Sequence, residues 1–427
     1  MRKTLSALLL SLWALCGSAQ TFDVMDIVRN DRDKASACEG PYRFDAPAPT
    51  PAPRGYKPFY ISHYGRHGSR YAWDSGTYTR IHDRLLAASG AGVLTERGRQ
   101  LLADFEAFYE IPLINTGDLV PLGWEQHRRI AETMGRDYPE VFRRGGTVRA
   151  RGSVSTRALV SMNSFTLALQ KMYPALEISA DSYHTNLPVT ARLTAPRQLA
   201  VEYAGRPTLP GGETYPAFAA RKIDYPGILG RLFTDDAFLG GAAGRMRLVM
   251  DLYDLWGGYH NYTDSDFLED LFTPDQQATL WEVANYRDYT DHGFNRYRHI
   301  DLLKDFERLA DEAIAGQGPC ADLRFGHDHV LNAFFPLLNL NGTGHMPDTA
   351  DEVKYWYQTY RTPMASNIQF ILYRPRRAGG EILFKVLHNG AEATLPQLTP
   401  VSGPYYKWSD FKDWCAALYE AHPPVVR

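Results

Sequence analysis

The stretch Phe59-Tyr60-Ile61-Ser62-His63-Tyr64-Gly65-Arg66-His67-Gly68-Ser69-Arg70-Tyr71 carries the clearest structural signal in this 427-residue chain. Its first five residues form a short, largely apolar run that predicts a β-strand, and Gly65 and Gly68 predict that the strand breaks into a loop. Loops that leave the carboxyl ends of sheet strands are where α/β proteins usually bind ligands. The sequence therefore predicts an α/β fold with a ligand-binding loop at residues 65–71.

This loop contains an imidazole between two guanidinium groups. Arg66 and Arg70 present paired N–H donors that match the oxygens of a phosphate group. A neutral imidazole nitrogen of His67 can attack phosphorus and carry the phosphoryl group as a covalent intermediate. Gly68 allows the backbone to approach the anion closely. The pattern favours phosphoryl transfer, whereas Arg-His-Gly alone is also compatible with a structural histidine.

A second motif whose side chains could take part in catalysis lies far downstream in the sequence. The residues Phe325-Gly326-His327-Asp328-His329 end another short apolar segment, which starts at Leu323, and they run into a helix-like stretch at 330–338. If both strand ends meet, one site gains a second histidine and a carboxyl group. Asp328 is then the candidate acid that delivers a proton to a departing alkoxide oxygen.

Together the two motifs resemble the histidine phosphatase superfamily, in the acid phosphatase branch that includes phytases and multiple inositol polyphosphate phosphatases. The family pattern is Arg-His-Gly-x-Arg early and His-Asp or His-Ala-Glu late. The resemblance implies that His67 is the nucleophile and that Asp328 protonates the leaving oxygen. It also implies phosphate contacts from Arg66, Arg70, Arg157 and His327. Arg157 matches the family's arginine on the helix after the next core strand, here residues 147–150.

The resemblance points to two branches of the family, which differ in substrate class. Tyr71, directly after the second arginine, is similar to the inositol polyphosphate branch, whereas His327-Asp328 is similar to the acid phosphatases. The expected function is an exported phosphomonoester hydrolase (EC 3.1.3.-) that acts on inositol polyphosphates such as phytate. A broad-specificity histidine acid phosphatase is the alternative within this class.

Other classes of function fit less well. A non-catalytic phospholigand-binding protein could dispense with Asp328, and a phosphomutase would find few sugar phosphates outside the cell. A metal site built on His327, Asp328 and His329 is disfavoured because clustered arginines oppose a cation. We therefore expect no metal and no cofactor. His63 and His345 are interpreted as structural, and His329 has no assigned role.

The first residues predict export. Arg2 and Lys3 precede an apolar run, and small residues follow it, which is typical of a signal peptide over residues 1–19. Cys16 raises the alternative of a lipid anchor, but Leu15 stands where a small residue is needed. No later stretch has the ~20 apolar residues needed to span a bilayer. We expect a periplasmic or secreted protein.

The net charge limits the kinds of partner that the protein can bind, and the cysteine content limits the disulfides that it can form. The formal net charge is −3 and no basic run suggests nucleic acid, so an anionic substrate would depend on a local basic pocket. The expected partner is a small phosphorylated molecule, and the oligomeric state stays open. Cys38, Cys320 and Cys415 remain in the mature chain, where an oxidising compartment would permit one disulfide whose pairing the sequence leaves open.

The remaining pattern predicts a three-layer α/β sandwich with a mostly parallel central sheet and an inserted, mainly α-helical cap. Residues 20–54 read as a Pro-rich lead-in, with globular structure from Gly55. The core is expected at 55–186 and 317–427 and the cap at 187–316. Helices are expected at 77–88, 95–109, 123–138 and 157–172, and strands at 147–150, 367–373, 381–388 and 391–395.

Overall fold

The computed structural model describes residues 23–182, 202–205, 207–377 and 379–425, so the expected signal peptide lies outside the described residues. Within these ranges one eight-stranded sheet runs in the order β3-β2-β4-β1-β5-β6-β7, and β8 pairs with β6. The strands are β1 (Tyr56–Arg66), β2 (Gly146–Gly152), β3 (Leu176–Asp181), β4 (Ala321–Gly326), β5 (Asn367–Pro375), β6 (Leu383–His388), β7 (Ala391–Ala393) and β8 (Tyr406–Lys407).

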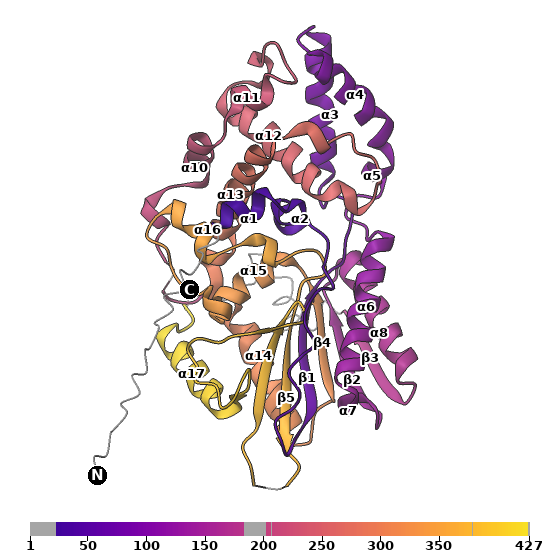
Figure 1. The fold of residues 1–427 in the computed structure, drawn as a ribbon, viewed down its shortest axis with the longest axis vertical. Helices are drawn as coiled ribbons and strands as arrows, with labels where there is room; N and C mark the ends of the chain where they lie inside the picture. Colours follow the sequence, from indigo (N-terminus) through magenta and orange to yellow (C-terminus); the bar gives the residue numbers. More distant parts are fainter. Residues whose placement is uncertain (1–22, 183–201, 206, 378, 426–427) are drawn as a thin grey trace, which may run out of the picture.

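Helices cover both faces of the sheet and make three layers (Figure 1). Successive side chains of a strand point to opposite faces. Tyr60 and Tyr64 of β1 therefore pack with α14 (Ile300–Ile314), α15 (Asp328–Leu337) and α17 (Trp408–Ala421). Ile61 packs on the other face with α6 (Pro121–Asp137), α7 (Pro139–Phe142) and α8 (Thr156–Met172). The predicted α/β class is confirmed.

Parallel pairing joins the strands that carry the motifs. β4 is parallel to both β1 and β2, and β2 is parallel to β3, whereas β5 pairs with β1 and β6 in antiparallel orientation. The carboxyl ends of β1, β4 and β2 consequently meet at one edge of the sheet.

The predicted break of β1 at Gly65 is wrong, because the strand continues to Arg66. Backbone pairing on both sides extends it: Gly65 lies opposite Phe325 of β4 and opposite Asn367 of β5. A Cβ atom at position 65 would lie 2.8 Å from the His63 ring, so the absence of a side chain serves packing within the strand here. The loop therefore begins two residues later than predicted, at His67.

A helical lobe stands above the carboxyl edge of the sheet (Figure 1). Its core contains residues from helices that come from widely separated parts of the chain. These helices are α1 (Val24–Arg29), α2 (Arg32–Ala35), α3 (Ser75–Gly90), α4 (Glu96–Phe108), α10 (Tyr215–Lys222), α11 (Tyr225–Leu229), α12 (Ala242–Gly258), α13 (Pro274–Asp291) and α16 (Val353–Trp356), with α5 (Glu110–Ile114) packed beside them. The lobe thus includes segments that precede the expected cap at 187–316.

The prediction that globular structure begins at Gly55 is wrong. Val24 and Val28 of α1 and Ala35 of α2 are buried in the core of the lobe. A 3-10 turn, Ala37–Glu39, follows them and leads toward the strand edge. The Pro-rich residues 46–53 carry no helix or strand, as expected.

Two further expectations concern disulfide bonds and membrane-spanning helices. The described cysteines Cys38, Cys320 and Cys415 are all free, so the disulfide that an oxidising compartment would permit is not formed among them. In the part of the chain that the structure describes, no helix combines the length and the apolar character needed to cross a bilayer.

Candidate active site

The carboxyl ends of β1 and β4 bring the two motifs together. Arg66 ends β1 and pairs with Gly326, which ends β4. The backbone N–H of His67 donates a hydrogen bond to the carbonyl oxygen of Gly326 over 2.9 Å. The centroids of the His67 and His327 rings are consequently 5.5 Å apart. Two stretches far apart in the sequence thus form one site.

Helices α6 and α8 fix the backbone of the loop. The N–H of Gly68 donates to Ser161 Oγ over 3.0 Å, and the N–H of Ser69 donates to Gln126 Oε1 over 2.8 Å. A Cβ atom at position 68 would lie 2.5 Å from the carbonyl oxygen of Gly123 in α6. Glycine is therefore required at position 68 because the loop and the helix touch through their backbones.

His67 is held as a neutral imidazole with a free lone pair. Its Nδ1 lies 2.9 Å from the carbonyl oxygen of Gly68. A carbonyl oxygen only accepts, so Nδ1 carries the hydrogen and Nε2 is left unprotonated. Burial, together with the nearby Arg66, Arg70 and Arg157, holds the pKa of His67 well below its usual value. The geometry suits a nitrogen nucleophile.

Arg66 is completely buried behind the loop. Its Nη1 donates to the carbonyl oxygen of Thr362 over 2.9 Å and to that of Cys38. Its Nη2 lies 2.8 Å from Asp328 Oδ2. Because a buried charge is costly without partners, these contacts fix the orientation of the guanidinium.

Arg70 and Arg157 complete an arginine cluster with Arg66. Both Nη atoms of Arg70 donate to the carboxylate of Glu39, over 3.1 and 3.2 Å. Arg157 lies in the first turn of α8, where backbone N–H groups also favour anions. Its Nε is buried without a partner, and among the described residues it forms no ion pair. Burial and the neighbouring Arg70 lower the pKa of Arg157 to about 10.

Replacing Arg157 with alanine is expected to raise the KM for phosphomonoesters about tenfold to hundredfold, because a charge-assisted contact to the phosphate is lost. The melting temperature should not fall, since Arg157 repels its arginine neighbours and lacks a carboxylate partner in the described structure. Steady-state kinetics and thermal unfolding test both points. Arg136→Ala is the control, because that side chain is 66% exposed and lies beside Asp137. An unchanged KM in the Arg157 variant contradicts the assignment.

His327 and Asp328 approach the arginine cluster from β4. Nε2 of His327 lies 2.9 Å from Ser153 Oγ, and burial, with His329 nearby, lowers its pKa to about 3. Asp328 begins α15, where the helix dipole favours a carboxylate. Burial alone would raise the pKa of Asp328, but the surrounding basic side chains, Arg66 first among them, together outweigh burial and hold that pKa well below its usual value. Asp328 is therefore a carboxylate in these surroundings.

A cavity of about 760 Å³ separates these residues from the helical lobe. Its near wall contains His67, Arg70, Arg157, His327 and Asp328, so all the predicted site residues except the buried Arg66 face it. The far wall comes mainly from α12 and α13 and includes Tyr253, Asp254, Arg287 and Asp288. Burial, with Asp328 nearby, raises the pKa of Asp288 to about 7.

The remaining motif histidines have different surroundings. His329 lines the cavity and stacks on His327, with centroids 5.3 Å apart, so it contributes to the wall. His63 is buried between Phe165 and Phe325, in keeping with a structural role.

Sequence reasoning missed two residues of this site. Glu39 contacts Arg70 from the 3-10 turn that precedes β1, and Ser153 contacts His327 from the end of β2. Ser153 could have been found, because it follows a predicted strand on the same sheet edge. Glu39 has no comparable signal, since it stands before the Pro-rich stretch and far from either motif.

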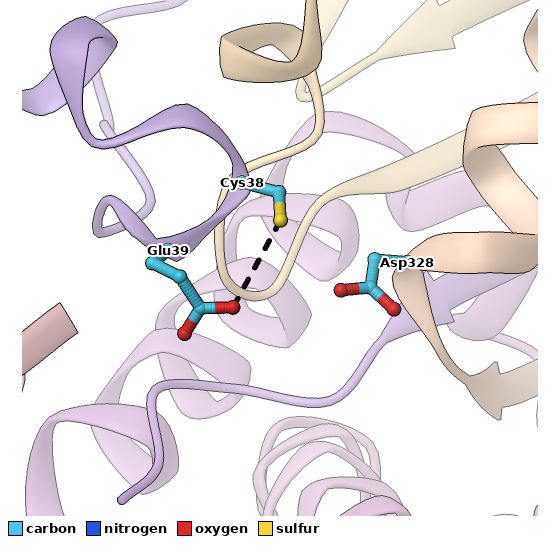
Figure 2. A group of neighbouring side chains, drawn as sticks. All are labelled: Cys38, Glu39 and Asp328. Atoms are coloured by element: carbon cyan, nitrogen blue, oxygen red, sulfur yellow. Dashed lines mark hydrogen bonds between the residues drawn. The ribbon is translucent and has the colours of Figure 1, made fainter. Parts of the chain in front are cut away.

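Figure 2 shows Glu39 and Asp328 with Cys38, whose potential ligand atoms lie within 4.8 Å of one another. Their chemistry does not favour a cation. Both carboxylates already contact guanidinium groups, and burial raises the pKa of the Cys38 thiol well above its usual value, so the thiolate that a metal needs is disfavoured. The surroundings favour an anion instead.

Comparisons with known proteins agree with this geometry at the level of the fold. No protein-family model matches the sequence, and a search of curated proteins gave no relative. The multiple inositol polyphosphate phosphatase of Bifidobacterium longum, solved with phosphate, superposes with a TM-score of 0.71 and 18% identity, over 90% of this chain and 98% of that one. The phytase from D. castellii superposes with a TM-score of 0.66 and 16% identity, over 96% of this chain and 90% of that one.

A phytase from Hafnia alvei, solved with tartrate, gives a TM-score of 0.55 and 12% identity, over 86% of this chain and 98% of that one. These likenesses extend over both the sheet and the helical lobe, because they cover most of each chain. The protein therefore has the fold of multiple inositol polyphosphate phosphatases and histidine acid phytases, as its two motifs predicted.

Proposed function

We propose that this protein hydrolyses phosphomonoesters through a phosphohistidine at His67. The observation that carries the proposal is the hydrogen bond from Nδ1 of His67 to Gly68, which leaves Nε2 unprotonated beside three guanidinium groups. Nε2 attacks phosphorus, a P–N bond forms, and the bond from phosphorus to the alcohol oxygen breaks. Arg66, Arg70, Arg157 and His327 contact the phosphoryl oxygens and stabilise the charge that develops on them.

Asp328 supplies the proton for the departing alcohol. In the empty site Arg66 keeps it ionised, but a phosphate dianion that takes over the donors of Arg66 removes this stabilisation and adds its own negative charge. Both effects raise the pKa of Asp328, so substrate binding itself favours the protonated acid. In the second step the carboxylate takes a proton from water as the oxygen attacks phosphorus, and the P–N bond breaks to release orthophosphate.

For the substrate we propose inositol polyphosphates such as phytate. The fold neighbours include a multiple inositol polyphosphate phosphatase that was solved with inositol hexasulfate. Tyr71, directly after Arg70, is the feature by which the sequence resembles that branch. We also propose that the protein is exported, on the signal-peptide pattern of residues 1–19.

A phosphate-release screen tests the substrate class. Inositol hexakisphosphate should give the highest kcat/KM among inositol phosphates, sugar phosphates and aryl phosphates. Similar values across all three groups would replace this assignment by a broad-specificity acid phosphatase. Binding of these compounds without release of phosphate would instead indicate a non-catalytic phospholigand-binding protein.

A further inference from the structure

The carboxylate of Glu39 lies against the arginine cluster itself. Its Oε2 accepts from Arg70 Nη1 over 3.2 Å, and its Oε1 accepts from Arg70 Nη2 over 3.1 Å. Oε1 also lies 3.5 Å from Nη2 of Arg66. In Figure 2, Glu39 and Asp328 come from different segments of the chain, the 3-10 turn Ala37–Glu39 and the start of α15. An acidic side chain from the chain's first turns thus contacts two arginines assigned to the phosphate.

These contacts use the donors that a phosphate group needs. Nη1 of Arg66 is committed to backbone carbonyl oxygens, and its Nη2 faces Asp328 and Glu39. Both Nη atoms of Arg70 face Glu39. A phosphate dianion at these donors would also place its charge beside the carboxylate of Glu39, where like charges repel strongly in a buried site. The substrate and Glu39 therefore exclude one another.

The contacts of Glu39 are longer than those of another ion pair that lines the same cavity. Arg80 contacts Asp251 through two hydrogen bonds of 2.7 Å each, whereas the contacts of Glu39 to the arginine cluster measure 3.1 to 3.5 Å. Charge-assisted hydrogen bonds strengthen as they shorten toward about 2.8 Å. The carboxylate is therefore a weak competitor that a dianion can displace.

The backbone of Glu39 is anchored separately from its side chain. Asn261 Nδ2 donates to the carbonyl oxygen of Glu39 over 2.9 Å. The side chain is 18% exposed and lines the cavity. It can therefore turn into the cavity by rotation of its own bonds while the 3-10 turn stays in place.

We propose that Glu39 is a specificity-determining residue: an internal anion that neutralises Arg66 and Arg70 in the empty site, yields to the phosphate of the substrate, and then competes with the orthophosphate product. A ligand must interact with the arginines more favourably than a carboxylate does, which selects phosphate dianions over carboxylates. This inference rests on the proposed phosphatase function.

Calorimetric titration of the full chain with orthophosphate tests the proposal. Glu39→Gln removes the charge at almost constant shape and should bind orthophosphate about tenfold more tightly, because no internal anion has to be displaced. The KM for a phosphomonoester and the inhibition constant of orthophosphate should fall by a similar factor, without a rise in kcat.

Asp291→Asn is the matched control. Asp291 lines the same cavity from the end of α13 and, within the described residues, forms no ion pair with the arginine cluster. Its replacement removes one negative charge from the cavity and should change orthophosphate affinity by less than about threefold, since exposed charges are screened. Equal gains in the two variants, or weaker binding by Glu39→Gln, would overturn the proposal.

Thermal unfolding keeps the test decisive if Glu39→Gln is unstable. Removing the Glu39 carboxylate leaves Arg66 and Arg70 less well neutralised. Added orthophosphate should therefore raise the melting temperature of Glu39→Gln and of Glu39→Ala by more than it raises that of the wild type. An equal or smaller gain in both counts against Glu39.

Hydrolysis of p-nitrophenyl phosphate by the same samples separates the two proposals. If the wild type hydrolyses the ester but the Glu39 variants bind orthophosphate with wild-type affinity, only the role of Glu39 is overturned. A wild type that neither binds orthophosphate nor hydrolyses the ester overturns both.

Discussion

Replacing His67 with alanine is expected to reduce turnover of both p-nitrophenyl phosphate and phytate by about 10⁴-fold or more, because no other group takes over the attack on phosphorus. His67 is the one imidazole of the loop whose Nδ1 is fixed by a backbone carbonyl and whose ring lies among the arginines. Rapid quenching with ³²P-labelled substrate should show an acid-labile, base-stable phosphoenzyme in the wild type and none in the variant.

The control for this experiment is His345→Ala. The ring of His345 lies against that of Trp356, with centroids 4.1 Å apart, and takes no part in either motif, so its loss should leave both turnover and the phosphoenzyme unchanged. The His67 variant should still bind orthophosphate, since the arginine cluster is intact. Substantial activity of the His67 variant toward both substrates would remove His67 as the nucleophile.

Asp328→Asn is expected to produce a loss that depends on the leaving group. An alkyl phosphate such as glycerol 2-phosphate releases a basic alkoxide, so loss of the acid should lower its kcat/KM by about 10²-fold to 10⁴-fold. p-Nitrophenolate leaves without much help, so the loss for p-nitrophenyl phosphate should be about tenfold or less. Steady-state kinetics with a series of esters of graded leaving-group basicity measures the difference.

Asp288→Asn is the matched carboxylate control. Asp288 faces the same cavity, and its raised pKa of about 7 means that it carries a proton in part of the molecules at neutral pH. It lies on α13 rather than at the end of β4, so its loss should affect all esters alike. If the dependence on the leaving group appeared in the Asp288 variant and not in the Asp328 variant, the acid would be Asp288.

Much of the site could be predicted because its chemistry is local in sequence. The loop after β1 and the residues after β4 were recognised by their residue types, and the helix after β2 was predicted to carry Arg157 in its first turn, where it is found. The helix expected at 95–109 is found as α4, and Thr95 caps its start by accepting the N–H of Gly98. In these cases neighbouring residues contain the physical cause of the structure.

The predictions that were wrong concern features whose physical cause lies in residues far away in the sequence. Gly65 was expected to end a strand on its own propensity, but pairing with β4 and β5 carries the strand past it. Residues 24–39 were expected to belong to the Pro-rich lead-in, yet Val24 and Val28 are buried in the core of the lobe. The contact of Glu39 with Arg70 depends on that packing.

The sequence by itself determined the α/β class and the placing of the two motifs at strand ends, because these depend on short-range patterns and on the chemistry of single side chains. Only the tertiary structure decided that Nδ1 of His67 faces a carbonyl oxygen, that Arg66 keeps Asp328 ionised, and that Glu39 lies against the arginine cluster. These contacts join strands, helices and the first turns of the chain across the sheet edge. Their distances and their electrostatic consequences exist only once those elements have packed together.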